Sequence, residues 1–172
     1  MVISEVRGDC VLVVNAGSSS LKLSRFRIRD HDLELAQHAD VEAPDGAGCD
    51  DTWVSQLVDD AIVAVGHRVV HGGTDFTAPT LVDDRVYAEL KRLVPLAPLH
   101  QPRNLAPIRA VRAARPALPQ VACFDTAFHR THPLLADVYA LPWRWYDAGI
   151  RRYGFHGLSY EYVAATLPDV AP

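Results

Sequence analysis

The stretch Val11-Leu12-Val13-Val14-Asn15-Ala16-Gly17-Ser18-Ser19-Ser20-Leu21-Lys22 indicates the fold class. Four apolar residues followed by Asn, Gly and Ser are typical of a buried strand that runs into a tight turn. Residues 21–28 also suit a strand, but the alternation of apolar residues shifts along it. Leu21 and Leu23 fall on one face, whereas Phe26 and Ile28 fall on the other. A bulge, or a strand buried on both faces, explains this shift.

A third strand follows, because Leu33-Glu34-Leu35 alternates cleanly after a predicted turn at 29–32. The opening of the chain is therefore predicted to be an antiparallel meander. Residues 39–51 are polar and rich in Gly, Asp and Pro, which predicts a loop.

Helical and strand patterns alternate through the rest of the chain, which indicates an α/β domain with a mixed sheet. Strands are predicted at 62–70 and 121–124, and helices at 54–61, after a cap at Asp83 or Asp84, from Asn104 to Pro116, and from Ser159 through Leu167. Asn104 is interpreted as a helix cap, with Pro107 in the first turn of its helix.

Composition excludes several classes of protein. The chain has 172 residues, enough for one well-packed domain. Its 17 basic and 21 acidic residues give a net charge of −4, which supports neither a nucleic-acid nor a membrane partner. No apolar run approaches the ~18 residues of a membrane span. The amino terminus lacks the apolar segment of a signal peptide, and three cysteines without metal-ligand spacing fit reduced thiols. We expect a cytoplasmic protein.

The turn after the first strand is the first candidate site. Successive backbone N–H groups and the hydroxyls of Ser18 and Ser20 suit phosphate oxygens, and Lys22 adds a positive charge. The alternative is an ordinary hairpin turn, since Asn, Gly and Ser all favour turns. The segment is neither a Walker A loop nor a nucleophile elbow.

The second candidate is Arg68, at the end of an apolar strand and followed by Gly72 and Gly73. A guanidinium there is costly to bury unless an anion meets it, and it can bind a carboxylate or phosphate with two parallel hydrogen bonds. An internal ion pair is the alternative. His67 and His71 have the spacing of metal ligands, but no carboxylate accompanies them.

Two further candidates lie later in the chain. His100, in a proline-framed apolar loop, is either a site residue or a buried core histidine. Asp125 follows an apolar strand, where open α/β sheets place their ligand sites. Arg151 and Arg152 precede the glycine-flanked His156, so contact with an anion is expected there as well.

Five segments of the chain, in order, resemble motifs of the acetate kinase family. They are residues 13–22, 66–73, 97–100, 124–129 and 151–157. Together they extend over nearly the whole chain. The sequence therefore resembles the amino-terminal half of an acetate kinase, in the superfamily that also contains sugar kinases, Hsp70 and actin.

The resemblance implies a fold and an activity. The fold is a ribonuclease-H-like (actin-like ATPase) domain, with a mixed five-stranded sheet that is antiparallel at its start and flanked by helices. Residues 1–172 correspond to the amino-terminal domain, and the carboxy-terminal nucleotide-binding domain is absent from the chain. The family catalyses ATP + acetate ⇌ ADP + acetyl phosphate with Mg²⁺ (or Mn²⁺), as a homodimer. We expect the chain alone to be weakly active or inactive.

The resemblance also implies residue roles. Asn15 and Asp125 belong to the metal and phosphoryl region, and Arg68 binds the acetate carboxylate and the transferring group. His100 is a further catalytic residue, and His156 stabilises the transition state. The residues implied to bind phosphate are Ser18, Ser20 and Lys22, and those implied to line the methyl pocket are Val70, Leu99 and Phe155.

These roles agree with the chemistry. Acetate, with a pKa of ~4, is already ionised at neutral pH, so no general base is needed. The barrier lies in bringing an anion up to a polyanion, and it is lowered by positive charge and fixed donors. We therefore expect Arg68 and His156 to converge on the end of the strand that carries Asp125, in a cationic pocket.

The chain departs from the family pattern at four positions. They are Thr74 (usually Glu), Gln101 (usually Asn), Leu158 (usually Thr) and Tyr160 (usually His). Three alternative functions stay open: a kinase for propionate or butyrate, a non-catalytic anion-binding fragment, and a zinc hydrolase.

Overall fold

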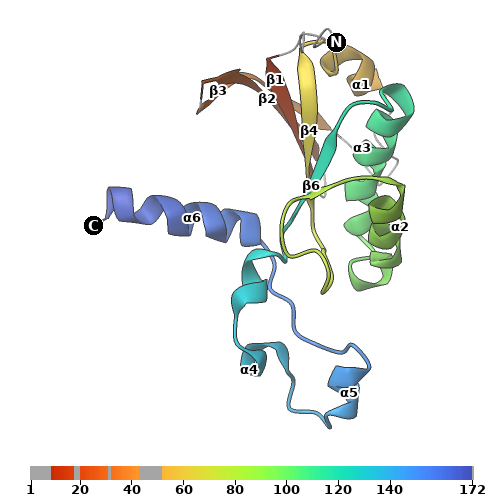
Figure 1. Ribbon diagram of the computed structural model, residues 1–172, viewed down its shortest axis with the longest axis vertical. Helices are drawn as coiled ribbons and strands as arrows, with labels where there is room; N and C mark the ends of the chain where they lie inside the picture. Colours follow the sequence, from red (N-terminus) through yellow and green to blue (C-terminus); the bar gives the residue numbers. More distant parts are fainter. Residues whose placement is uncertain (1–8, 18–19, 31, 43–51, 172) are drawn as a thin grey trace, which may run out of the picture.

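The computed structural model describes residues 9–17, 20–30, 32–42 and 52–171, which form a mixed sheet with helices (Figure 1). Six strands lie in the order β3-β2-β1-β4-β6-β5. Their bounds are β1 Cys10–Ala16, β2 Ser20–Arg29, β3 Asp32–Glu42, β4 Ile62–Val69, β5 Thr80–Leu81 and β6 Gln120–Phe124.

Strand directions confirm the predicted mixed sheet with an antiparallel opening. β1, β2 and β3 form an antiparallel meander, and β4 and β6 run parallel to β1. The predicted count of five strands is wrong by one, because β5 adds an antiparallel edge to β6. A two-residue strand is too short to produce a periodic pattern, so the sequence gives no signal for it.

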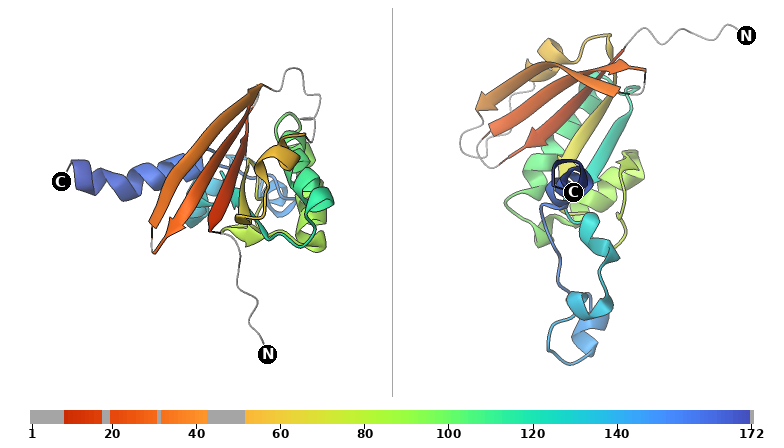
Figure 2. Two further views of the ribbon diagram at one scale, coloured as in Figure 1. Left: turned by 90° about the horizontal axis from the view of Figure 1, so that it is seen from above. Right: turned by 90° about the vertical axis from the view of Figure 1, so that its left-hand side faces the viewer.

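Three helices cover one face of the sheet: α1 (Thr52–Leu57), α2 (Asp84–Arg92) and α3 (Gln101–Ala114) (Figures 1 and 2). β1 alternates accordingly, with Leu12 and Val14 buried and Val13 38% exposed on the opposite face. The core divides into two clusters, one beneath β1, β2 and the start of β4, and the other beneath β6 and the end of β4. α3 contributes side chains to both clusters and so joins the two parts of the sheet.

The irregularity predicted in the second strand is present. The pairing of β2 with β3 shifts register between Arg25 and Phe26, as a bulge requires. The predicted turn at 29–32 is also confirmed, with Asp30 in the left-handed region at φ 49°. The loop expected at 39–51 is wrong for its first part, because residues 39–42 pair with β2, and residues 43–51 lie outside the described residues.

Helix starts were predicted with mixed success. Asp83 caps α2 as expected, since its Oδ1 accepts a hydrogen bond from the Val86 amide at 2.7 Å. The interpretation of Asn104 as a cap is wrong, because α3 begins at Gln101 and places Asn104 and Pro107 in its interior. The last helix, α6 (Gly157–Val170), begins two residues earlier than expected.

An excursion between β6 and α6 lies apart from the sheet (Figure 1). It contains η3 (Phe128–Thr131), α4 (Leu134–Asp137) and α5 (Arg144–Asp147). Elsewhere in the chain, a short 3₁₀ turn, η2 (Val94–Leu96), precedes α3. The buried carboxylate of Asp137 anchors the excursion by pairing with Arg130 at 3.0 Å and with His132.

Helix α6 projects away from the rest of the chain (Figures 1 and 2). Its single buried residue is Gly157, and its charged residues are Glu161 and Asp169. Exposed apolar or aromatic side chains include Tyr162, Val163 and Leu167. None of the described helices has the length and apolar character of a membrane span.

His67 is a buried polar group in the middle of β4. Its side chain is 1% exposed, and Nε2 lies 2.8 Å from Oε1 of Gln120, while Nδ1 has no partner among the described residues. Burial lowers the pKa of His67 to about 4, although the hydrogen bond to Gln120 opposes that shift.

We predict that acid destabilises the fold through this histidine. The unfolded chain binds a proton at His67 below pH 6.5, whereas the folded chain does so only near pH 4. The free energy of unfolding should therefore fall by about 3 kcal/mol as the pH decreases through that window. Urea unfolding of the wild type and of His67→Gln at several pH values measures the effect. An equal pH dependence in both proteins would contradict it.

Candidate functional site

The candidate site lies at the carboxyl ends of the parallel strands, on the face that α1, α2 and α3 leave open. Asn15 is near the end of β1, Arg68 near the end of β4, and Asp125 directly follows β6. Strand pairing therefore brings three polar side chains from distant parts of the sequence to one edge of the sheet, where open α/β sheets bind ligands.

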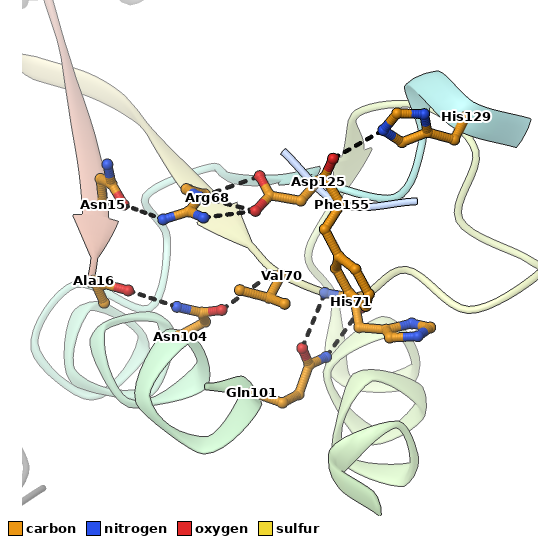
Figure 3. Close-up of polar contacts among 10 residues, drawn as sticks. All are labelled: Asn15, Ala16, Arg68, Val70, His71, Gln101, Asn104, Asp125, His129 and Phe155. Carbon is orange, nitrogen blue, oxygen red and sulfur yellow. Dashed lines mark hydrogen bonds and ion pairs between the residues drawn. The ribbon is translucent and has the colours of Figure 1, made fainter. Parts of the chain in front are cut away.

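Arg68 links the other two side chains (Figure 3). Its Nη2 donates to Oδ2 of Asp125 at 2.6 Å, and its Nε lies 3.1 Å from both carboxylate oxygens. On the other side, Nη1 donates to Oδ1 of Asn15 at 3.0 Å. The Asp125 side chain is 2% exposed and that of Arg68 27% exposed, so the pair is only partly screened by solvent.

The pairing of Arg68 with Asp125 changes the expectation of a cationic pocket. The sequence left open whether Arg68 meets a ligand or an internal ion pair, and the structure has an ion pair within the site itself. The pocket is therefore charge-balanced at this pair rather than simply cationic. A guanidinium has five N–H donors, and the contacts to Asp125 and Asn15 leave one N–H on each terminal nitrogen for a ligand.

A cavity of about 360 Å³ opens beside the pair. Its lining residues are Arg68, Val70, Leu96, Ala97, His100, Asp125, Phe155 and His156. Arg68, His156 and Asp125 thus converge on one cavity, as expected. Among the described residues, neither the His100 nor the His156 ring has a hydrogen-bond partner, so both rings are available to a ligand.

Other predicted residues are placed less favourably. Leu99 is 76% exposed and does not line the cavity; Leu96 and Ala97 supply the apolar wall from that loop. Lys22 pairs with Asn15 across β1 and β2, and directly opposed residues share a face, but Lys22 does not line the cavity. Ser20 begins β2, and Ser18 lies outside the described residues.

A close backbone contact sets the position of His156. The Gly157 amide donates to the Asp125 carbonyl oxygen at 2.7 Å, and a Cβ at position 157 would come within 2.3 Å of that oxygen. Only glycine permits this approach. His156 precedes the contact in the left-handed conformation, at φ 59°, which aims its ring into the cavity rather than along α6.

Phe155 forms an apolar wall that the surrounding residues hold in place. Its carbonyl oxygen lies 2.9 Å from Nε2 of His129, and its ring meets His71 edge to face at 5.7 Å. The buried His71 ring also meets Tyr153 at 4.4 Å, and its Nδ1 accepts from the Gly73 amide at 2.9 Å. Burial lowers the pKa of His71 and raises that of Tyr153, so it favours the neutral form of both rings.

Arg151 and Arg152 do not reach the cavity. The Arg151 guanidinium lies 4.5 Å from the centre of the Tyr146 ring, and that of Arg152 lies 5.1 Å from the centre of the Tyr139 ring. The expected anion contact is therefore replaced by cation–π packing within the excursion.

Two of the residues that depart from the family pattern, Tyr160 and Gln101, make defined contacts in the structure. Tyr160 meets the His129 ring at 5.5 Å, which supports the same histidine that binds Phe155. Gln101 is fully buried. Its Oε1 accepts a hydrogen bond from the His71 amide, and its Nε2 donates one to the His71 carbonyl oxygen.

Sequence reasoning missed the structural role of Asn104 and Gln101. Both amides are buried on the inward face of α3, three residues apart, and they bond backbone groups beyond the end of β4. A signal was available, because Asn104 shares the helical face of Ile108 and Val111, and an amide on such a face needs a buried partner.

A metal site is only partly formed by the described residues. They contain no group of three or more His, Cys, Asp or Glu side chains suited to a metal ion. Asp125 and Asn15 do supply oxygen donors, and Mg²⁺ commonly uses one or two such groups together with water and substrate phosphates. Both donors fit that mode, although Arg68 now binds their oxygens.

Comparison with known proteins identifies the family. The model of the acetokinase family matches residues 49–170. The chain belongs to the acetokinase family.

Acetokinase relatives match nearly the whole chain. It is 49% identical to acetate kinase of Nitrobacter hamburgensis, over 95% of this chain and 48% of the relative. The chain is 45% identical to acetate kinase of Methylocella silvestris, over 95% of this chain and 50% of the relative. The chain thus spans about half the length of the curated relatives it matches.

Solved acetokinase structures confirm the actin-like ATPase fold. Acetate kinase of Porphyromonas gingivalis superimposes with a TM-score of 0.75 at 33% identity, over 95% of this chain and 49% of that one. A propionate kinase of Francisella tularensis gives the same TM-score at 32% identity, over 94% of this chain and 49% of that one.

We predict that Gly157→Ala disrupts the site. The added methyl group would collide with the Asp125 carbonyl, so the start of α6 must move and take His156 with it. The free energy of unfolding should fall by about 1–3 kcal/mol, as measured in urea. Gly149→Ala is a control, because its Cβ meets nothing within 4 Å, although its φ of 91° carries its own strain. A larger loss at position 149 than at 157 would contradict the role of this contact.

Proposed function

We propose that the chain is the carboxylate-binding half of an acetate kinase, which transfers a phosphoryl group reversibly from ATP to acetate. The main support is the position of Arg68. It lies at the ends of the parallel strands, it retains one N–H on each terminal nitrogen, and it borders a cavity with an apolar wall.

The cavity suits a small carboxylate. Two N–H groups of a guanidinium match the two oxygens of a carboxylate. Val70, Ala97 and Phe155 supply the apolar surface against which a methyl group would pack. His100 and His156 also line the cavity, where their ring N–H groups could donate to the phosphoryl group.

The proposed chemistry requires no general base. Acetate is ionised at neutral pH, so the residues need to orient two anions and reduce their repulsion. Asp125 is paired with Arg68, and this pairing favours its ionised form as a partner of the guanidinium over a role in removing a proton. We assign it instead to holding the guanidinium and to the metal region, together with Asn15. Mg²⁺, when bound there with ATP, would neutralise phosphate charge.

The donors for the nucleotide are proposed to come from the rest of a polypeptide of family length. Among the described residues, a cavity lies at the strand ends and α6 is largely uncovered. We therefore expect little or no turnover from the chain alone, and a cytoplasmic enzyme with ATP and ADP as co-substrates.

Propionate is a second candidate acceptor. The Francisella tularensis neighbour is a propionate kinase, and the open cavity of about 360 Å³ does not by its size exclude one more methylene. An extra methylene is worth only ~1–3 kcal/mol of discrimination. Comparison of kcat/KM for acetate and propionate decides between them.

We predict that Arg68→Leu strongly weakens carboxylate binding by the chain. Loss of two charge-assisted hydrogen bonds should raise the Kd for acetate about 100-fold, as measured by calorimetry at constant ionic strength. Arg109→Leu, on the exposed side of α3, is the matched control and should bind as the wild type does. Circular dichroism checks that both variants fold.

Kinase activity is tested in a chimera that joins this chain to the unmatched part of the Nitrobacter hamburgensis enzyme. Hydroxylamine trapping should detect acetyl phosphate from ATP, Mg²⁺ and acetate, with KM raised and kcat lowered by Arg68→Leu. Wild-type kinetics in that variant would refute the role of Arg68. Carboxylate binding without turnover in a folded chimera would favour a non-catalytic anion-binding domain.

A further inference from the structure

Beyond the residues that line the cavity, Asn104 occupies an unusual position between two strands (Figure 3). The backbone pairing of β1 with β4 ends at Val14 and His67. The next residues of these strands are Asn15 and Arg68, whose side chains form the site. The two site residues therefore lie just past the point where β1 and β4 stop pairing with each other.

Asn104 bridges these two strand ends. Its Nδ2 donates to the Ala16 carbonyl oxygen at 2.8 Å, and its Oδ1 accepts from the Val70 amide at 2.9 Å. The side chain is 1% exposed. One carboxamide from α3 therefore connects β1 and β4 where their backbones no longer pair.

The chemistry of the two partners requires an amide. A carbonyl oxygen needs a donor and an N–H needs an acceptor, and a carboxamide supplies both. A carboxylate would place an oxygen against the Ala16 carbonyl. An apolar residue of the same size would leave a buried N–H and a buried C=O unpaired.

We infer that Asn104 is a positioning residue for Arg68. Ala16 follows Asn15, and Val70 lies two residues after Arg68, so the bridge fixes the separation of the two site residues. That separation determines whether Nη1 of Arg68 reaches Oδ1 of Asn15 at 3.0 Å while Nε and Nη2 hold Asp125. Asn104 thus sets the orientation of the guanidinium without touching it.

Gln101 provides an internal comparison. It lies on the same helical face one turn earlier, is fully buried, and bonds the amide and carbonyl of His71 and the Leu90 carbonyl. None of these partners belongs to β1. Gln101 therefore supports the loop after β4, whereas Asn104 couples β4 to β1.

The Arg68 side chain in the ¹⁵N-labelled chain reports on this coupling directly. Its Nε–H resonance is assigned by its absence in Arg68→Lys. Asn104→Leu should shift or broaden this resonance, and Gln101→Leu, which removes a buried amide from the same helix, should not. If Asn104→Leu does not fold, Asn104→Asp replaces it, since it keeps the acceptor for Val70 and puts an oxygen in place of the donor to Ala16.

Acetate titration of the same samples gives the functional consequence, which depends on the proposed function. The Kd should rise about tenfold in the Asn104 variant and stay near the wild-type value in Gln101→Leu. An unchanged Arg68 resonance in the folded Asn104 variant, or equal shifts in the Asn104 and Gln101 variants, would overturn the inference. If the wild type does not bind acetate but the resonance responds as expected, the proposed function fails and the positioning role stands.

Discussion

The ion pair between Arg68 and Asp125 is the interaction on which the site depends. Asp125 is 2% exposed, and a carboxylate so deeply buried is costly unless a cation and hydrogen bonds compensate it. Arg68 provides that compensation and uses a third contact to hold Asn15. One guanidinium therefore ties together the ends of three strands that are adjacent in the sheet but far apart in sequence.

Such a cluster requires support from outside the sheet. Parallel strands twist relative to each other, and their ends separate where the ladder stops. Here α3 compensates with buried amides, which bond the backbone groups that no neighbouring strand reaches. The same helix fills both core clusters, so the packing of the core and the geometry of the cavity are not independent.

The sequence predicted the features that depend on local patterns and on motifs. Apolar runs gave the strands, the shift in alternation near Phe26 gave the bulge, and Asp83 gave a helix cap. Arg68 was predicted as a candidate site residue from its position at the end of an apolar strand, and Asp125 from its position after one. Their ion pair was one of two alternatives, because composition does not reveal which carboxylate a guanidinium will meet.

Features that depend on tertiary contacts could not be predicted in this way. Asn104 has the local chemistry of a cap, and only the nearness of Ala16 and Val70 gives it another role. Leu99 belongs to the right motif, yet the conformation of the loop exposes it, and Leu96 and Ala97 line the cavity instead. β5 is too short to be seen without β6 beside it.

The attachment of α6 has a mechanical consequence. The helix starts at the hydrogen bond between Gly157 and Asp125 and then extends through 14 residues with little contact to the domain. It is roughly 21 Å long, so a rotation of about 10° at Gly157 would displace Val170 by about 4 Å. A rotation at Gly157 would thereby be amplified along the helix, and its far end would move the most.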